Sequence, residues 1–393
     1  MWAISLSAFF ADSGYQSVLA GFPLFLVIAL HQPVWEFGLA SAVSYGGGAA
    51  FSWAGAALGD RIGHRRLALL GNASIPLLSL SALTGSPAAA IGLLCGGWWA
   101  RNLRTPSRRV MLVEAVPNEG DRNSVFGFLH ALDVGGGAVA GIFVLAAILG
   151  HLAFKWIFLV TVAPLALSTL SLSRAHTGEP RGGRPAGPGR RPANRAAVGE
   201  RPALPGARYL LGASALYGFT FYSVGFPVLT VAKGGRAMAY GIGAFLLFQA
   251  ASAATGYLLA GRLRTGLRQR FVDLGLLGYA ASGLGSVLLA AGYAAHLGIV
   301  MLLAGVAVLG FALGVIETLE PSLMSVLRPG RLAGRAFGSL SAARSVGLFA
   351  ANLVLGLLYG LGPAWSYGYA AAVAAAAAAI VLAAVPARSA APG

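Results

Sequence analysis

Residues 297–316 read LGIVMLLAGVAVLGFALGVI, a stretch of apolar and small side chains without one charged residue. A helix needs about 20 apolar residues to cross the hydrocarbon core of a bilayer. Lipid offers no partner for backbone N–H and C=O groups, so a run of this length folds as a helix rather than as an isolated strand. The stretch therefore predicts a transmembrane helix.

The rest of the chain repeats this pattern. Of its 393 residues 57% are hydrophobic and only 10% are charged, and the mean hydropathy is +0.74. Soluble domains carry about 25% charged residues, so the composition excludes a soluble globular protein. The apolar runs lie near residues 2–30, 37–58, 67–84, 88–104, 123–149, 153–173, 208–231, 238–260, 271–293, 297–316, 334–361 and 364–386. We predict an all-α integral membrane protein with twelve transmembrane helices.

The basic residues indicate how these helices are oriented. The net charge is +16, but the lysines and arginines stand between the apolar runs and form no basic face for nucleic acid. With the N-terminus inside, only Lys155, Lys233 and Arg236, three of the 28 basic residues, fall on the outer side. This asymmetry satisfies the positive-inside rule. We expect a multi-pass protein of the inner (cytoplasmic) membrane with both termini in the cytoplasm.

A polar segment divides the chain into two similar halves. Residues 174–207 are rich in Arg, Pro and Gly, which predicts a disordered cytoplasmic linker between a bundle at 1–173 and a bundle at 208–393. It serves as a solvated tether or as a contact for anionic lipid. The repeats include Gly21-Phe22-Pro23 with Gly225-Phe226-Pro227, and Phe126-Gly127 with Phe337-Gly338. Such parallel repeats place the substrate path between pseudo-symmetric halves, near the membrane midplane.

The loop at residues 56–66 reads AALGDRIGHRR and stands between the second and third predicted helices. It resembles the G-x-L-a-D-R-x-G-R-R signature of the major facilitator superfamily. The resemblance covers essentially the whole chain and implies two six-helix bundles that expose a central site alternately to each side. It also implies a latch that closes the cytoplasmic side, formed by Asp60, Arg61, Gly63, Arg65, Arg66 and, at the start of helix 11, Arg335. A purely topological role for the arginines is the alternative.

Further segments resemble a poorly characterised prokaryotic branch of that family. In the first half these are Arg104-Thr105-x2-Arg108, Val116-Pro117 and Phe126-Gly127-x3-Ala131-x-Asp133; in the second half, Glu317-Thr-Leu-Glu320-Pro321. Where the branch usually has a His-Arg pair, this chain has Leu129-His130. The chain departs from the branch at Gln16, where an acid is common, and at Ala260, where Asp60 would repeat. It also has Ala140-Gly141 in place of the Gly-Pro associated with antiporters.

Ionisable groups within membrane spans are expensive, so each is a functional candidate. Asp12 lies about 15 Å along the first helix, near the midplane, where desolvation favours proton uptake by its carboxylate. Tyr15 and Gln16 share its helix face. The sequence predicts a proton or substrate site here; the alternative is a buried aspartate hydrogen-bonded to a neighbouring helix.

Charges of opposite sign also occupy repeat-equivalent positions, Asp133 in helix 5 and Arg344 in helix 11. Unpaired charges in the membrane are costly, so we expect Arg104 and Arg108 to pair with Asp133, and Glu317 and Glu320 to pair with Arg344. These clusters either break and reform during transport or clamp neighbouring helices permanently.

The sequence carries no motif for catalysis. It has no P-loop, no catalytic triad or metal-ligand spacing, and a single cysteine, Cys95. We therefore expect neither an enzyme nor a cofactor or metal. We expect a monomeric secondary transporter that exports a small apolar or amphipathic compound in exchange for protons. The predicted substrate and proton residues are Asp12, Tyr15, Gln16, His130, Asp133 and Arg344. The alternatives are uptake of a small organic anion on Arg344 and a non-transporting membrane sensor or scaffold.

Overall fold

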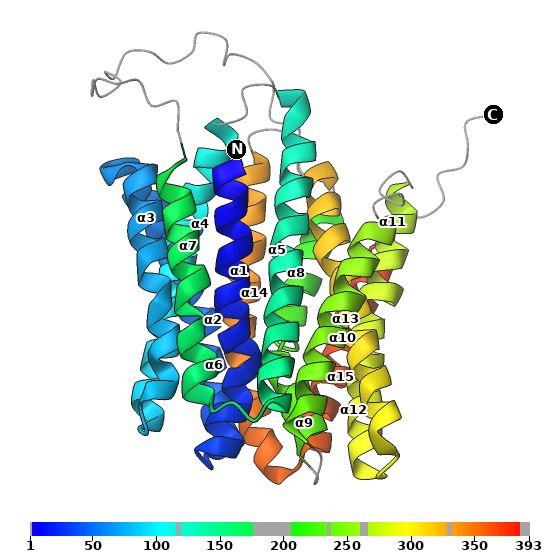
Figure 1. Ribbon diagram of the computed structural model, residues 1–393. Coiled ribbons are helices and arrows are strands. Elements are labelled where there is room, and N and C mark those ends of the chain that lie inside the picture. The colour runs from blue at the N-terminus through cyan, green and yellow to red at the C-terminus, as the bar shows by residue number, and fades with distance from the viewer. Residues whose placement is uncertain are drawn as a thin grey trace, which may run out of the picture.

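The computed structural model consists of helices that run along one common direction (Figure 1). It describes residues 2–114, 119–175, 206–233, 237–259, 266–327 and 332–385, with no account of the side chains at 109, 113–114, 119–131, 133–134, 325 and 332–343. Throughout these ranges every regular element is a helix, which confirms the predicted all-helical class.

The helices of the first half are α1 (Trp2–Leu24) with the π-helical η1 (Phe25–Ala29), α2 (Val34–Ile62), α3 (His64–Ser74) with the 3-10 segment η2 (Ile75–Leu83), α4 (Pro87–Glu114), α5 (Glu119–Leu149), α6 (Phe154–Val160) and α7 (Val162–Ser173). Those of the second half are α8 (Gly206–Gly218), α9 (Gly225–Ala232), α10 (Met238–Leu259), α11 (Leu267–Asp273), the π-helical η4 (Leu274–Ala280), α12 (Ala281–Ala294), α13 (Gly298–Leu327), α14 (Leu332–Leu361) and α15 (Pro363–Ala383).

Prolines explain two of the joints. Pro76 stands within the first two residues of η2, where the regular α3 gives way to 3-10 geometry. Pro23 lies inside α1 just before the π-helical η1. A proline removes one N–H donor and crowds the preceding turn, so the helix changes its hydrogen-bonding pattern near that point.

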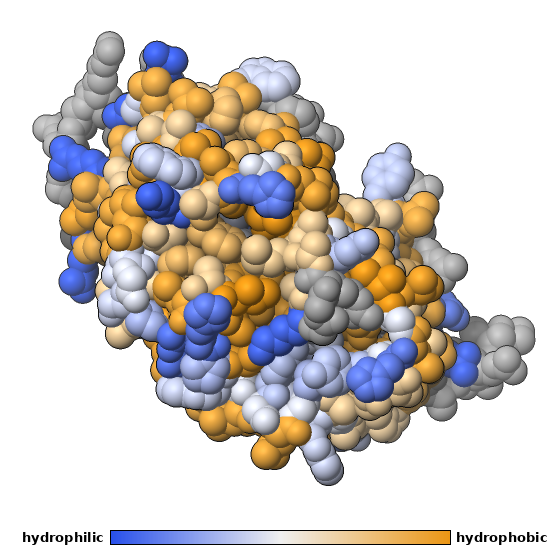
Figure 2. Space-filling model, turned by 60° about the horizontal axis from the view of Figure 1, so that its bottom comes forward, coloured by the Kyte–Doolittle hydropathy of each residue, from blue (hydrophilic) through white to orange (hydrophobic). Residues whose placement is uncertain are grey.

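Seven helical segments of the described chain are long and apolar enough to cross a membrane, and the most apolar is Gly298–Met324 with a mean hydropathy of 2.8. Its core is the stretch from which the sequence analysis started. The molecule is thus a multi-pass membrane protein, as expected, and Figure 2 shows hydrophobic residues over much of the surface in view. Twelve spans stay a prediction.

The expected continuous helix over 208–231 is wrong. The chain leaves α8 after Gly218 and enters α9 only at Gly225. The broken segment is held by neighbours: Thr220 Oγ1 donates to Ala370 O at 2.7 Å, and Ser223 N donates to Asn352 Oδ1 at 2.9 Å. Apolar periodicity cannot reveal such a break, which is tolerated at membrane depth only where other groups satisfy the backbone.

Helices of each half pack on one another, and we call these two groups the first and the second bundle. In the first half α1 packs on α5 and α7, and α4 packs on α2 and α3; in the second, α13 packs on α10 and α12, and α15 on α12 and α8. The halves meet where α2 lies against α14, α5 against α10 and α1 against α9. At the first of these contacts Gly38 and Gly356 face each other so closely that a Cβ on Gly38 would lie 2.7 Å from Gly356 Cα.

The two ends of the molecule differ in charge. We call the end at which α1 begins and α2 ends the basic end, since its described residues include Arg61, Arg65, Arg66, Arg174, Arg208, Arg268 and Arg270. In Figure 1 it lies at the top. Gly63, in the turn between α2 and α3, has φ of +93°, a conformation that suits glycine. His31, His151 and His296, at the opposite end, follow helix termini with φ of +54°, +55° and +51°. Histidine is among the residues enriched in this left-handed region.

Candidate functional site

Asp12 lies inside the first bundle. Its side chain is buried, and Tyr15, one turn further along α1, donates its hydroxyl hydrogen to Asp12 Oδ1. Tyr15 is itself only 1% exposed. The two predicted residues, Asp12 and Tyr15, are therefore in contact. The hydrogen-bond donor to the carboxylate is a phenol hydroxyl from the same helix.

Arg101 of α4 joins this group from across the bundle. Its Nη2 donates to Tyr15 Oη at 3.1 Å, and its Cζ lies 4.8 Å from the Trp98 ring centroid and 5.0 Å from that of Tyr15. A guanidinium over aromatic faces is held by cation–π attraction as well as by its hydrogen bond. Arg101 was not among the predicted site residues; its signal was a third arginine, one turn before Arg104, near the end of an apolar run.

Arg104 is buried, and a neutral side chain accepts its hydrogen bond. Arg104 Nη1 donates to Asn72 Oδ1 of α3. The Asn72 amide in turn donates to Ser168 Oγ at 3.0 Å and to Thr169 Oγ1 at 2.9 Å, both in α7. This network ties α3, α4 and α7 together around a buried cation. Arg108 is also buried. The expected partner of both arginines, Asp133, and the candidate His130 lie outside the described side chains, so that pairing stays a prediction.

The second bundle buries a different acid, Glu320 of α13. Its side chain is fully buried, Tyr279 donates its hydroxyl hydrogen to Oε1, and Ser214 Oγ donates to Oε2 at 3.2 Å. Tyr279 stacks on Tyr217 with ring centroids 4.7 Å apart. Both carboxylate oxygens of Glu320 are thus satisfied by hydroxyl donors from α8 and η4.

Arg344 of α14 bridges the two glutamates, as the sequence analysis expected. Arg344 Nη2 lies 3.0 Å from Glu317 Oε1, and Nη1 lies 3.5 Å from Glu320 Oε2. The Glu317 side chain is 54% exposed and that of Glu320 is 0% exposed, so one cation joins an accessible acid to an inaccessible one. The guanidinium also lies 5.3 Å from the Phe221 ring centroid, in the break between α8 and α9.

A pocket lies between the bundles, with Trp98 in its wall. Its lining residues are Gln16, Leu19, Phe22, Phe37, Ser41, Ser44, Tyr45, Leu94, Trp98, Ser223, Val224 and Phe245. Trp98, on which Arg101 stacks, also makes an edge-on contact with Tyr45 at 5.3 Å. Of the predicted residues, Gln16 lines this space. The volume is about 50 Å³, so the bundles are nearly closed around it in this conformation.

A second pocket adjoins the first at Val224. Residues of the break between α8 and α9 line it, among them Phe221, and so does Tyr217 of α8. Arg344 stacks on Phe221 as Arg101 stacks on Trp98. Each bundle therefore presents an arginine on an aromatic side chain that lines a pocket, and the two pockets meet near the break.

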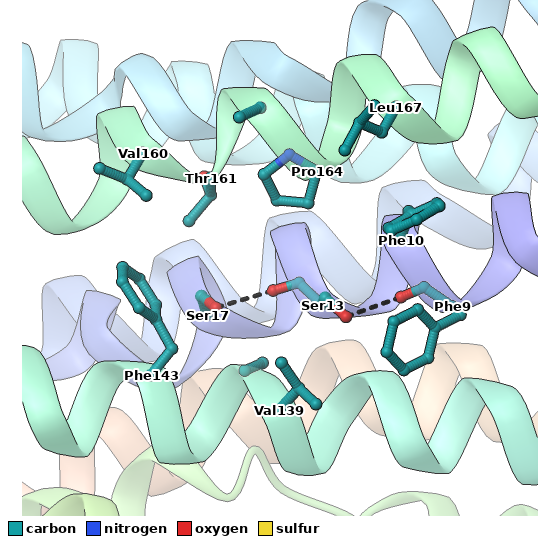
Figure 3. Close-up of a pocket in the computed structure, with 12 residues that line it drawn as sticks. Phe9, Phe10, Ser13, Ser17, Val139, Phe143, Val160, Thr161, Pro164 and Leu167 are labelled. Atoms are coloured by element: carbon teal, nitrogen blue, oxygen red, sulfur yellow. Dashed lines mark hydrogen bonds between the residues drawn. The ribbon is translucent and has the colours of Figure 1, made fainter.

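A third cavity, of about 300 Å³, opens between α1, α5 and the α6–α7 segment (Figure 3). Its two serines are turned back on α1: Ser13 Oγ donates to Phe9 O at 2.8 Å, and Ser17 Oγ donates to Ser13 O at 2.7 Å. The surface left to an occupant is apolar, and Val139, which lines it, is 46% exposed. This cavity suits hydrocarbon and offers no group for proton chemistry.

The residues of the expected latch lie at the basic end. The Asp60 side chain is 77% exposed, and its Oδ1 lies 3.4 Å from Nε2 of His64. Arg65 Nη2 donates to Ser173 O at 2.7 Å, and Arg61 and Arg66 are exposed. The side chain of Arg335, the expected partner of Asp60, lies outside the described part, so the latch stays a prediction.

Comparisons with known proteins agree with this architecture. The sequence profile of the Major Facilitator Superfamily matches residues 4–273. Three solved structures cover nearly the whole chain: a POT family transporter in complex with a thioalcohol conjugated peptide, the nucleoside transporter NupG, and a bacterial homolog of the human lysosomal transporter Spinster in an inward-facing and unoccupied conformation.

The likeness to these structures concerns the fold. The TM-scores are 0.75, 0.72 and 0.66, at sequence identities of 15%, 15% and 14%. The matches cover 97%, 98% and 98% of this chain and 95%, 99% and 95% of the respective structures. No curated protein sequence matches the chain. Identities this low establish a shared fold and leave the cargo to be argued from this chain's own residues.

Proposed function

The chain belongs to the Major Facilitator Superfamily, and from this premise we propose that it is a proton-coupled secondary transporter of a small amphipathic compound, working by alternating access. Membership in this family makes it a membrane transporter rather than an enzyme. In the proposed form it is a monomer with twelve spans in two bundles, 1–173 and 208–393. The basic end, with both termini and the linker at 174–207, faces the cytoplasm.

The proposal is carried by one observation: each bundle buries a carboxylate that a tyrosine hydroxyl and an arginine hold in place. Asp12 has Tyr15 and, through it, Arg101; Glu320 has Tyr279 and Arg344. A buried carboxylate near a cation is stable in two forms, charged while the cation is close or neutral once the carboxylate is protonated. Such a group can carry a proton between two conformations.

In the second bundle, Arg344 links the proton site to the contact between the bundles. Arg344 lies on α14, and about three turns further along the same helix is Gly356, which packs against Gly38 of α2 in the other half. When Glu320 is protonated, its ion pair with Arg344 is lost, and Arg344 keeps only its ion pair with Glu317. We propose that the resulting shift of α14 loosens its contact with α2, which is how protonation favours one access state.

In the first bundle, Asp12 sits at a close approach of α1 and α5. A Cβ on Gly136 of α5 would lie 2.6 Å from Phe9 O and 2.9 Å from Asp12 Cβ, so the glycine lets the two helices meet at the carboxylate. α5 then contacts α10 of the second bundle. A change in charge at Asp12 therefore acts on a helix that reaches the other half.

The substrate path we propose runs through the pockets on either side of Val224. Neighbours of the same fold are described as peptide and nucleoside transporters, which shows that this fold accommodates polar small molecules. The sequence predicts export, because few polar groups lie at mid-membrane. Arg101 adds a charged group to them. The direction of transport relative to the proton therefore depends on the charge of the substrate.

Proton flux in proteoliposomes with an internal pH dye tests the proposal. The panel holds cationic amphiphiles, organic anions and sugars. We expect one class to evoke proton movement in the wild type and in Glu36→Gln, a control at the opposite end of α2, and no movement in Asp12→Asn. Silence of the folded wild type toward the whole panel, or equal flux in Asp12→Asn, would overturn the coupling that we propose.

A further inference from the structure

We propose that the second bundle carries a proton path, a row of hydroxyl groups that leads from the end opposite the basic end to the carboxylate of Glu320. Polar groups inside a membrane protein are costly, and a row of them is typical of a proton relay. This inference rests on the proposed function and deepens it, because it names the route by which the buried acid gains its proton.

The inner part of the row ends at Glu320, whose two carboxylate oxygens have different partners. Oε1 accepts the hydroxyl hydrogen of Tyr279, whereas Oε2 accepts from Ser214 and lies 3.5 Å from Nη1 of Arg344. Arg344 also binds Glu317, the second charged neighbour of this acid. A proton that comes through Tyr279 therefore neutralises the charge to which the arginine is bound.

The middle part of the row follows α12, which runs toward the opposite end. Tyr217 stacks on Tyr279, and its Oη lies 3.1 Å from Ser282 Oγ. One turn further along α12, Ser286 Oγ lies 3.1 Å from Tyr222 Oη. In each of these two pairs either hydroxyl can donate to the other, so a proton can pass in either direction.

The second pocket touches both of these pairs, since Tyr217, Ser282 and Tyr222 line it. Its volume is about 20 Å³. One water molecule needs about 10–15 Å³ of such space and two to four polar partners, and the three hydroxyls supply the partners. The proposed path therefore includes one water molecule here, which joins the pair at Tyr217 to the pair at Tyr222.

The outer part of the row centres on Thr230 of α9, at the opposite end (Figure 1). Thr230 Oγ1 lies 2.6 Å from Tyr367 Oη and 2.8 Å from Tyr359 Oη. The Tyr367 ring contacts that of Tyr222, with centroids 5.8 Å apart. Lys233, partly exposed after the end of α9, places its Nζ 5.7 Å from the Tyr359 ring centroid. The row thus reaches from the buried acid to the surface.

Two steps of the row run between tyrosine rings in contact, from Tyr279 to Tyr217 and from Tyr222 to Tyr367. Among the hydrogen bonds of the described residues none spans either step. A phenol hydroxyl donates, accepts and turns about its C–O bond, so a small movement of a ring closes the step. The row is interrupted in this conformation and closes transiently, which prevents a steady leak of protons.

Transfer along this row leaves every hydroxyl as it began. The Glu320 carboxylate takes the hydrogen of Tyr279, the Tyr279 oxygen takes one from the next hydroxyl, and the sequence continues outward. The last oxygen takes its hydrogen from water beside Lys233. At each step one O–H bond breaks and one forms, so the net change is one proton moved from outer water to the carboxylate.

Infrared difference spectroscopy of the full-length chain in lipid bilayers tests the path with the proton as the only probe. A step from pH 8 to pH 5 should produce the C=O band of a protonated carboxyl, and its loss in Glu320→Gln assigns that band. We expect Thr230→Val and Tyr222→Phe to slow the band by at least about tenfold and to leave its final amplitude unchanged.

Two variants serve as controls, and thermal unfolding checks that each variant is folded. Thr230→Ser keeps the hydroxyl and should keep the wild-type rate. Tyr257→Phe removes a phenol hydroxyl from a residue of α10 that is 84% exposed, outside the row, and should also leave the rate unchanged. Since Thr230 and Glu320 lie at opposite ends of the row, an effect of Thr230→Val on the band means that protons enter at the opposite end.

An unchanged rate in folded Thr230→Val, or equal slowing in Thr230→Val and Thr230→Ser, would overturn the path and leave these hydroxyls a role in packing. The absence of a Glu320 band in the wild type would overturn it as well. If Thr230→Val fails to fold, Tyr222→Phe against Tyr257→Phe decides in the same way. Failure here is separable from failure of the proposed function. Fast protonation in every variant, together with evoked proton flux, would sustain the transporter and overturn the path, whereas slowed protonation without any evoked flux would do the reverse.

Discussion

The contact between α2 and α14 predicts a strong and selective effect of one methyl group. In Gly38→Ala the added Cβ would lie 2.7 Å from Gly356 Cα and 2.7 Å from Asn352 O. Carbon atoms in contact stay about 3.5–4.0 Å apart, so the helices must separate by roughly 1 Å. Both neighbours are backbone atoms, which cannot swing aside as a side-chain end would.

The expected cost follows from this overlap. Overpacking of a tight contact costs about 1–3 kcal/mol. This cost destabilises only the conformation in which α2 and α14 touch. The population of that conformation relative to a separated state should therefore drop roughly 5- to 150-fold. Gly360→Ala, in α14, is the control, because a Cβ there meets nothing within 4 Å. Both changes raise helix propensity alike, so their difference isolates the overlap.

Spin-label distances measure the shift. Labels at Trp156→Cys and Leu297→Cys, both half-exposed at the opposite end and one in each bundle, are introduced with Cys95→Ser to remove the native thiol. We expect Gly38→Ala to move the distance distribution toward longer values, and Gly360→Ala to leave it as in the parent. Identical distributions in the two variants would refute the reasoning that this contact closes the opposite end.

Three further changes test other parts of the structure. Gly63→Ala places a side chain at φ of +93° and should destabilise the chain by about 1–3 kcal/mol in denaturant unfolding, and an unchanged midpoint would contradict that strain. Asn72→Leu removes the acceptor of buried Arg104 and should cost about 1.5–3 kcal/mol in the same assay; a loss below about 0.5 would show that the bond contributes little. Arg344→Met leaves Glu320 without its counterion, which should cost about 3–5 kcal/mol at pH 8. That cost should shrink at pH 5, where a protonated carboxyl needs no counterion, and Glu320→Gln in the same chain should recover most of it; no recovery would argue against the pair.

The helical membrane fold could be predicted because it depends on composition and length. Apolar runs near 20 residues leave the backbone one way to satisfy its hydrogen bonds. The pairing of Arg344 with Glu317 and Glu320 was also accessible, since a charge in a membrane span needs a partner and few candidates exist.

The rest depended on three-dimensional contacts that one sequence does not display. The break at 219–224 is stabilised by Asn352 and by the backbone of Ala370, more than a hundred residues away. Arg104 donates a hydrogen bond to the neutral Asn72, a contact that charge pairing alone does not predict. Arg101 was missed because an arginine near the end of an apolar run resembles a residue at the membrane boundary. Its place over the ring of Trp98 emerges only in the folded chain.

Uphill accumulation tests the coupling of protons to transport most directly. Proteoliposomes are loaded with the compound that evokes proton flux, and its accumulation under an imposed pH gradient is compared with its exchange at equal pH. Wild-type protein should do both. Asp12→Asn and Glu320→Gln should still exchange the compound but fail to accumulate it, because the path remains while the proton sites are lost. Accumulation at the wild-type level in both variants would contradict the assignment of the two buried carboxylates as the coupling groups.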